Sequence, residues 1–278
     1  MFLIDDRELL AMLREDAPYG DLTTRSLGLG RAEGHIVFSA RDPMVACGVE
    51  EASRLFTLLG CAVEHACRSG EARQPGEVIL AARGSAEALF TTWKVAQTLV
   101  EWASGVATAA NRVVLAVRAV QAEVVVACTR KAIPGTRALS LKAITAGGAV
   151  VHRSGLSDTV LLFPEHRSFE AADGLRRQIE ALRTACPERA VVVEVTSHDE
   201  ALRAAESGAS VVQLEKFAPD QVAAVIEALA GSPAKVAAAG GINATNAADY
   251  ARAGAAILVT SAPYHAKPAD VAVTLEPA

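Results

Sequence analysis

The feature that most constrains the fold of this chain is a repeated alternation of short apolar segments with amphipathic helices from Glu123 onward. The segments are apolar nearly throughout, so both of their faces must be buried, as in a parallel sheet. Six repeats can form an open doubly wound sheet or a barrel, and no GxGxxG motif follows the first strand to favour a dinucleotide-binding sheet. The expected strands are 124–128, 159–163, 190–195, 210–214, 235–239 and 256–260.

The first hundred residues have a mixed pattern of helices and strands. A long helical pattern begins at Ser85, is expected to break at Ser104 and Gly105, and resumes to about Val120. Shorter helices are expected at 5–15 and 49–60. Strands are expected at 34–40, 44–48, 61–68 and 77–82, and residues 271–275 resemble one more strand that returns to this part of the chain.

Composition excludes several classes of protein. The net charge of −5 is unlike that of a protein with general affinity for nucleic acid or anionic membranes. Five cysteines, an odd number without CxxC spacing, indicate free thiols rather than a disulfide framework. Acidic residues near the N-terminus do not suit a signal peptide, and no uncharged apolar run approaches about 18 residues. We therefore expect a cytoplasmic protein without a membrane span.

A cationic stretch is the most informative local feature. Between residues 124 and 157 there is no Asp or Glu, although the whole chain is acidic. A solvated basic face is one interpretation. However, Arg130 and Lys131 directly follow an expected strand, and parallel α/β folds place their active sites at the carboxyl ends of strands. The stretch therefore predicts a pocket for a multiply anionic ligand. Its basic residues are Arg130, Lys131, Arg137, Lys142, His152 and Arg153.

Acidic residues and glycines stand at later strand ends. Glu194 and Glu215 indicate binding of hydroxyls or a divalent cation, although salt bridges across the strand ends would also explain them. Gly240 and Gly241 follow the fifth strand, and Asn243 is placed to cap the next helix, so exposed backbone amides could bind phosphate there. Ser261 and His265 follow the sixth strand and could close that site.

No group stands out as a nucleophile. The GxSxG motif is absent, the cysteines have no neighbouring histidine pair, and no His/Cys cluster has metal-ligand spacing. Lys131 lies at a strand end and could form a Schiff base, so a phosphate-binding barrel lyase remains an alternative function.

Several motifs in order along the chain resemble the quinolinate phosphoribosyltransferase (nicotinate-nucleotide pyrophosphorylase, carboxylating) family. They are 15–24 (EDAPYGDLTT), 104–108 (SGVAT), 129–137 (TRKAIPGTR) with Lys142, Gly147–Gly148, His152–Arg153, Glu194, Gly240–Gly241–Ile242 and His265.

The resemblance implies a two-domain α/β pentosyltransferase. An N-terminal α/β sandwich (residues 1–107, completed by 268–278) would pack with an incomplete α/β barrel of six or seven strands (108–267). It implies a homodimer with shared active sites, phosphoribosyl pyrophosphate (PRPP) with Mg²⁺, a ring nitrogen as nucleophile, and release of pyrophosphate.

The resemblance also implies roles for particular residues. Glu194 and Glu215 would hold the ribose hydroxyls, either directly or through a Mg²⁺ ion. The contact between these carboxylates and Mg²⁺ could pass through water. The Gly240 and Gly241 amides, near His265, would bind the 5′-phosphate. Lys131 and Lys142 would neutralise pyrophosphate, and Lys131 is a candidate catalytic residue with the two acids. The anionic aromatic acceptor would be oriented by Arg130, Arg137, His152, Arg153 and the partner's Lys94.

The chain departs from the family pattern at the acceptor side of the site. The family's LIKDNH segment reads Leu161–His166 here, so its lysine becomes Phe163 and its asparagine becomes Glu165. Lys94 replaces an arginine of the family, and Glu215–Lys216 replace the Asp-Asn of the family's LDN motif. These changes resemble the ModD branch, whose members accompany molybdenum-uptake genes. A non-catalytic binder of a phosphosugar or oxyanion that keeps the fold remains the alternative function.

Overall fold

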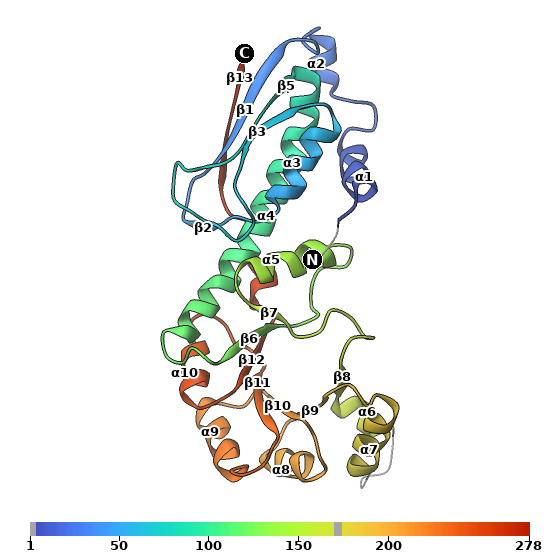
Figure 1. Ribbon diagram of the computed structural model, residues 1–278, viewed down its shortest axis with the longest axis vertical. Helices are drawn as coiled ribbons and strands as arrows, with labels where there is room; N and C mark the ends of the chain where they lie inside the picture. The colour runs from blue at the N-terminus through green and yellow to red at the C-terminus, as the bar shows by residue number, and fades with distance from the viewer. Residues whose placement is uncertain (1–3, 170–173) are drawn as a thin grey trace. The chain divides into compact units, whose positions relative to one another are not determined.

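The computed structural model describes residues 4–169 and 174–278 of the 278-residue chain. These residues form two compact units (Figure 1). The first, called the N-terminal unit, comprises the residues up to 111 together with 132–148 and 263–278. The second, called the barrel unit, comprises 112–131 and 149–262. Each unit is thus assembled from separate stretches of the sequence.

A curled parallel sheet forms the centre of the barrel unit. Its strand order is β7-β6-β12-β11-β10-β9-β8, and every neighbouring pair is parallel. The order follows the chain around a circle that stays open between β7 and β8, which confirms the predicted incomplete barrel. The strands are β6 (Val125–Cys128), β7 (Val150–Val151), β8 (Val160–Leu162), β9 (Val191–Val195), β10 (Val211–Glu215), β11 (Lys235–Ala239) and β12 (Ile257–Thr260).

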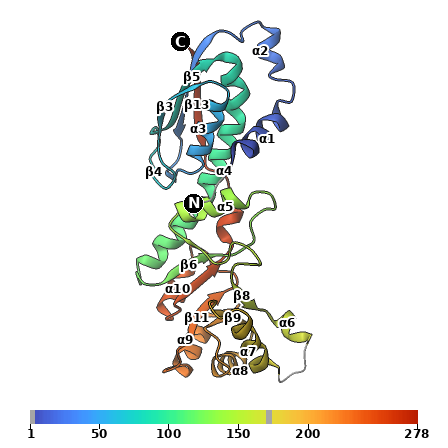
Figure 2. The same cartoon turned by 45° about the vertical axis from the view of Figure 1, so that its right-hand side comes forward.

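Burial explains why these segments form strands. In β11, four of five residues are buried, and Ala237, Ala239 and Val259 form a small apolar cluster. Helices lie around the outside of the curled sheet in the two views (Figures 1 and 2). The two-residue strand β7 was not among the six expected segments, because it is too short to show a period. The helices are α6 (Pro164–Ser168), α7 (Leu175–Ala185), α8 (His198–Glu206), α9 (Pro219–Ala228) and α10 (Ala247–Arg252).

The N-terminal unit contains an antiparallel sheet in the order β13-β1-β5-β3. Alternate residues of β1 are buried, namely Ile36, Phe38 and Ala40. The rings of Phe38 and of Phe56 on α3 form an edge-to-face pair with 6.0 Å between their centroids. β13 pairs with β1, which confirms the expected returning strand. The strands are β1 (Glu33–Ala40), β2 (Met44–Val45), β3 (Ala62–Ala66), β4 (Ala72–Arg73), β5 (Val78–Ser85) and β13 (Val271–Pro277).

The helices that begin in this unit are α1 (Asp6–Asp16), α2 (Leu22–Ser26), α3 (Val49–Leu58), α4 (Ala86–Arg118) and α5 (Arg137–Ala146). The short 3-10 helix η1 covers Ala262–His265. No helix in the described ranges, 4–169 and 174–278, has both the length and the apolar character needed to cross a membrane.

The break expected at Ser104 and Gly105 is wrong, since α4 continues through both residues. A Cβ atom at Gly105 would lie 2.3 Å from the carbonyl oxygen of Lys267, so glycine there permits a close approach of the segment that leads to β13. The buried Ser104 hydroxyl accepts a hydrogen bond of 2.9 Å from the backbone N–H of Cys47. Both residues therefore serve packing and do not end the helix.

Candidate active site

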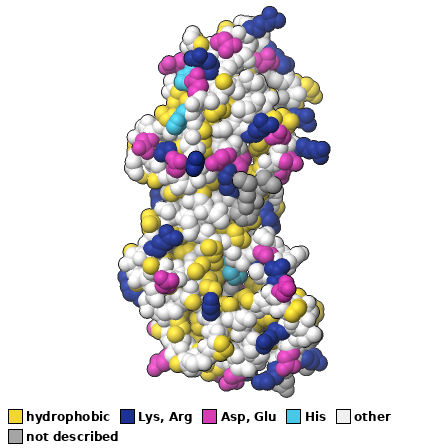
Figure 3. All heavy atoms as spheres, in the orientation of Figure 1, with side chains coloured by type: hydrophobic (Ala, Val, Ile, Leu, Met, Phe, Trp, Pro, Cys, Tyr) yellow, Lys and Arg dark blue, Asp and Glu magenta, His cyan; other side chains and the backbone are white. Residues whose placement is uncertain are grey.

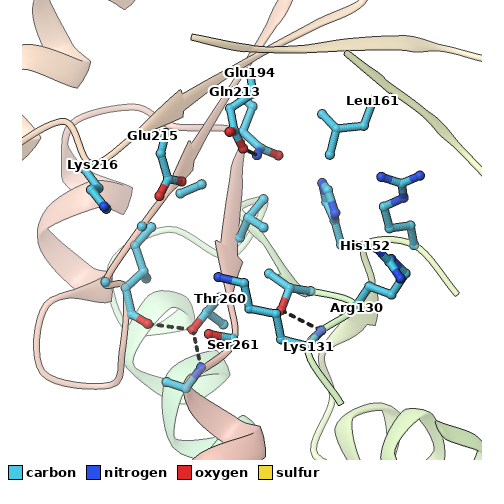
Figure 4. A pocket seen from close by; sticks show the side chains of 18 of the residues that line it. Arg130, Lys131, His152, Leu161, Glu194, Gln213, Glu215, Lys216, Thr260 and Ser261 are labelled. Carbon is cyan, nitrogen blue, oxygen red and sulfur yellow. Dashed lines mark hydrogen bonds between the residues drawn. The ribbon is translucent and has the colours of Figure 1, made fainter. Parts of the chain in front are cut away.

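A cavity of about 510 Å³ opens at the carboxyl ends of the barrel strands, entirely within the barrel unit. Arg130 follows β6, Glu194 and Glu215 lie at the ends of β9 and β10, and Gly240 follows β11. Figure 4 shows the side chains of Arg130, Glu194 and Glu215 arranged around one hollow, and Figure 3 shows hydrophobic side chains gathered on this unit with charged ones beside them. The topology thus brings together the strand-end residues that the sequence singled out.

Three cations line one side of the cavity. Arg153 is only 6% exposed, whereas Arg130 and Lys131 are exposed. Among the residues that the structure describes, no carboxylate forms an ion pair with any of the three. Arg153 donates one long hydrogen bond, 3.4 Å, to the carbonyl oxygen of Thr159, and its buried Nε has no partner in the described part of the chain. Burial, followed by repulsion from Arg130, lowers the pKa of Arg153.

His152 lies beside these cations in the cavity lining. Burial is the main cause that lowers its pKa below the ordinary value of 6.5, and the positive charge of Arg153 lowers it further. The imidazole is therefore neutral near pH 7, so it can donate one hydrogen bond and accept another.

Two carboxylates line the opposite side. Burial, followed by repulsion from Glu215, raises the pKa of Glu194. Glu194 Oε2 accepts a hydrogen bond of 2.7 Å from Nε2 of Gln213. No group of three metal-ligating side chains occurs in the described ranges. The pair nevertheless suits Mg²⁺, which proteins hold through one or two carboxylates together with substrate phosphates, because a cation would relieve the repulsion.

The glycine pair after β11 gives the cavity a bare backbone edge. Gly240 and Gly241 have φ of 89° and 77°, in the left-handed region, and a Cβ at Gly240 would lie 2.7 Å from Cγ of Lys216. The cap expected at Asn243 is wrong. Its Oδ1 accepts a bond of 2.9 Å from the N–H of Thr245 in a local turn, and α10 begins later, at Ala247. The phosphate role of the glycines stays a prediction.

Apolar side chains complete the lining. Leu161 and Phe163 face the cavity at the end of β8. The Phe163 ring stacks on His166, with 5.7 Å between ring centroids, and its backbone N–H donates to His166 Nδ1 at 3.0 Å. The position where the resemblance implies a cation is therefore an apolar wall of the cavity.

Four of the predicted site residues belong to the N-terminal unit. Lys94 lies exposed on α4, and its Nζ is 4.3 Å from the ring centroid of the neighbouring Trp93. Lys142 on α5 is largely buried in an ion triad with two glutamates, Glu50 at 2.8 Å and Glu51 at 2.6 Å. The remaining two, Arg137 at the start of α5 and His265 in η1, are exposed. Their predicted roles stay predictions.

Sequence reasoning missed Gln213, which lines the cavity and lies between the apolar residues Val212 and Leu214 of β10. A single polar residue inside an apolar run was the available signal. Lys216 also lines the cavity with a left-handed φ of 62°, an uncommon conformation for a residue other than glycine.

Comparisons with known proteins agree with this geometry. Residues 21–104 match the family model of the quinolinate phosphoribosyl transferase N-terminal domain, and residues 106–274 match that of its C-terminal domain. ModD of Rhodobacter capsulatus is 58% identical over 229 residues, which cover 82% of this chain and 88% of that protein. The human nicotinate-nucleotide pyrophosphorylase (carboxylating) is 33% identical over 211 residues, 76% of this chain and 70% of the relative. The crystal structure of NadC from Streptococcus pyogenes superposes with a TM-score of 0.89 at 26% identity, over 98% of this chain and 96% of that one.

Proposed function

The chain belongs to the quinolinate phosphoribosyltransferase family, and from this premise we propose that it transfers phosphoribosyl from PRPP to a ring nitrogen of an anionic heteroaromatic acid. In the proposed reaction, the lone pair of the ring nitrogen forms a bond to C1 of the ribose. The bond from C1 to the pyrophosphate oxygen breaks, and pyrophosphate leaves with that electron pair. No covalent enzyme intermediate is required, which agrees with the absence of a recognisable nucleophile from the sequence motifs.

The observation that carries this proposal is the buried guanidinium of Arg153, which no described carboxylate pairs. A buried charge is stable only when it is paired or hydrogen-bonded. Arg153 instead makes one long hydrogen bond and is repelled by Arg130, while Asp158 attracts it only from beyond ion-pair distance. An anionic ligand in the cavity would supply the missing partner, and Arg holds carboxylate and phosphate through two parallel hydrogen bonds.

The two sides of the cavity suit the two substrates. In our proposal Glu194 and Glu215 accept hydrogen bonds from the ribose hydroxyls, and the backbone at Gly240–Gly241 approaches the 5′-phosphate. Lys131 neutralises the departing pyrophosphate. Mg²⁺, when bound, would add positive charge next to the same leaving group. Arg130 and Arg153 hold a carboxylate of the acceptor, and neutral His152 donates or accepts a hydrogen bond beside it.

Catalysis in such a site rests on positioning and electrostatics. The transition state is oxocarbenium-like, with positive charge on the ribose and negative charge on pyrophosphate. Glu194 and Glu215, with Lys216 beside Glu215, lie across the cavity from Arg130, Lys131 and Arg153, so groups of both signs are available to match this separation of charge. Groups that are fixed before the reaction stabilise such charges without reorganisation.

The test is an assay of pyrophosphate release with PRPP, Mg²⁺ and a panel of pyridine and azole carboxylic acids. We expect release with at least one acid and a loss of at least about 10²-fold in kcat/KM for Arg153→Met, since a charged contact to substrate is removed. Arg252→Met, which removes an exposed arginine on α10 that pairs with Asp249, is the matched control. PRPP binding by calorimetry without release across the panel would favour a non-catalytic phosphosugar binder.

A further inference from the structure

Lys216 is a cavity residue with an unusual backbone conformation. It directly follows β10, lines the cavity and has a φ of 62°, in the left-handed region. Within residues 4–169 and 174–278, every other residue with a positive φ is a glycine. Glycine and asparagine adopt this conformation readily, whereas it is costly for a residue with a long side chain. Residues held in such conformations cluster at ligand sites, so this lysine is a candidate for a role in binding.

Hydrogen bonds on both sides of Lys216 hold the conformation. The backbone N–H of Lys216 donates to the carbonyl oxygen of Ala239 at 2.8 Å, which continues the pairing of β10 with β11 by one residue. The carbonyl oxygen of the next residue, Phe217, accepts a buried hydrogen bond of 3.0 Å from the hydroxyl of Tyr250. The direction in which the Lys216 side chain leaves the backbone is therefore set by the fold.

Gly240 gives the side chain of Lys216 its room. A Cβ atom at Gly240 would lie 2.7 Å from Cγ of Lys216 and 3.0 Å from Oε1 of Glu215. The absence of a side chain at Gly240 thus lets the lysine and the carboxylate pack against the bare backbone after β11. Lys216 and this backbone consequently lie side by side in the lining of the cavity.

The ammonium group of Lys216 has no partner among the side chains that the structure describes. The residue is exposed although it lines the cavity. No carboxylate in the described ranges lies within ion-pair distance of its Nζ, and no described group forms a hydrogen bond with that atom. Three N–H donors can therefore contact a ligand without breaking any contact of the described chain.

The cavity has positive groups on two sides. Figure 4 shows Lys216 at the left of the hollow beside Glu215, and Arg130 at its right. Glu194 lies on the wall between these two sides. PRPP carries charge in a similar order, because its ribose hydroxyls lie between a phosphate at C5 and the pyrophosphate at C1.

We propose that Lys216 binds the 5′-phosphate of the donor substrate, together with the backbone at Gly240–Gly241. This inference rests on the proposed function. There Lys131 and the arginines take the pyrophosphate and the acceptor, so Lys216 is the cation left for the phosphate at C5. A lysine adds a full positive charge to a site where backbone amides supply only partial charges, and a charged donor forms the stronger hydrogen bond to phosphate.

Ribose 5-phosphate and pyrophosphate carry the two anionic ends of PRPP separately, so they are the probes. Calorimetric titrations of each probe, with Mg²⁺ present, compare wild type with Lys216→Asn. Asparagine adopts the left-handed backbone and carries no charge. We expect ribose 5-phosphate to bind about 10- to 100-fold more weakly to the variant, the loss typical of a charge-assisted hydrogen bond. Pyrophosphate affinity should change by less than about threefold, since its contacts lie on the other side of the cavity.

Control variants separate the charge of Lys216 from its place in the fold. Lys216→Arg keeps the positive charge and should bind ribose 5-phosphate within about threefold of wild type. Lys235→Asn removes an exposed lysine where β11 begins, at the other end of the strand, and should leave both affinities unchanged. The melting temperature of Lys216→Asn should equal or exceed that of wild type, because asparagine relieves the strained backbone. If Lys216→Asn does not fold, Lys216→Gly makes the same test, since glycine adopts this φ at no cost.

Several outcomes would overturn the inference. They are unchanged ribose 5-phosphate affinity in Lys216→Asn, no binding of this probe to wild type, or an equal loss for both probes, which would indicate only a general attraction of anions. A lower melting temperature together with the loss of affinity would assign Lys216 a structural role instead.

The assay of pyrophosphate release separates this inference from the proposed function. Release by wild type, combined with unchanged ribose 5-phosphate affinity in Lys216→Asn, would refute only the role of Lys216. Binding of ribose 5-phosphate that depends on Lys216, without release from PRPP across the panel of acids, would support the inference and count against the proposed transfer.

Discussion

Replacing Glu194 by Gln should raise the stability of the free protein and weaken its binding of PRPP. Burial, and then repulsion from Glu215, raises the Glu194 pKa above its ordinary value of 4.5. A carboxyl group whose pKa is raised in the folded state favours folding when protonated and opposes it when ionised. At pH 7 Glu194→Gln removes this unfavourable charge, so we expect the melting temperature to rise.

The same linkage sets the pH window of the effect. Well below pH 4.5 Glu194 is protonated in both the folded and the unfolded protein, so wild type and variant should melt at the same temperature. The difference should grow as pH rises through the raised pKa of the folded state. Glu194→Gln preserves the shape of the side chain and an oxygen that Gln213 Nε2 can still reach, so packing changes little. Glu188→Gln, at an exposed carboxyl, is the control.

Ligand binding should change in the opposite direction. If Glu194 holds the ribose hydroxyls or Mg²⁺, the amide loses a charge-assisted contact worth about 1–3 kcal/mol, a decrease of about 5- to 150-fold in PRPP affinity. Calorimetry with PRPP and Mg²⁺ measures this loss, and scanning calorimetry between pH 4 and 8 measures stability. Unchanged PRPP affinity, or a melting temperature that falls at pH 7, would refute the reasoning.

Three further predictions test the acceptor side, the oligomer and the fold. Quinolinate should be a poor substrate, at least about 10²-fold below the usual kcat/KM range, because one carboxylate would face the Phe163 ring; turnover at about 10⁴ M⁻¹s⁻¹ would contradict this. Inactive Lys94→Ala and Arg130→Ala chains, equilibrated as a 1:1 mixture, should recover about a quarter of wild-type activity through mixed dimers with one intact site, whereas unshared sites would give none. Gly105→Ala should lower stability by about 1–3 kcal/mol in chemical unfolding, since its Cβ would overlap the Lys267 carbonyl at 2.3 Å; wild-type stability would disprove the close approach.

The barrel was predictable from the sequence because its strands are buried on both faces. Such strands leave continuous apolar runs, and successive runs separated by helices imply parallel neighbours whose carboxyl ends meet. This rule alone placed Arg130, Glu194, Glu215 and Gly240 around one cavity. It needs no knowledge of side-chain contacts, only the period of the pattern and the position of each polar residue relative to its strand.

Features that depend on contacts between distant segments were not predictable in this way. Gly105 resembles a helix break in sequence, yet it lies inside α4. Glycine is needed there because the chain near Lys267 approaches the helix closely. Asn243 is a residue type that often caps helices, but its side chain accepts a hydrogen bond from Thr245 in a local turn. The helix α10 begins only after this turn, at Ala247. Lys142 was assigned to ligand binding from its charge, and only the folded chain reveals its two glutamate partners.

The distribution of charge in the cavity connects these observations. Arg130 and Arg153 repel one another on one side, and Glu194 and Glu215 do so on the other, so the protein's own charges include two unfavourable like-charge pairs. A ligand with anionic groups alone would relieve the first pair and worsen the second. A ligand that brings hydroxyls or a cation to the carboxylates and an anionic group to the arginines relieves both. A phosphoribosyl donor with Mg²⁺ beside an aromatic acid has this combination. A simple oxyanion lacks it, so the electrostatics of the site favour transfer between two substrates over storage of one ion.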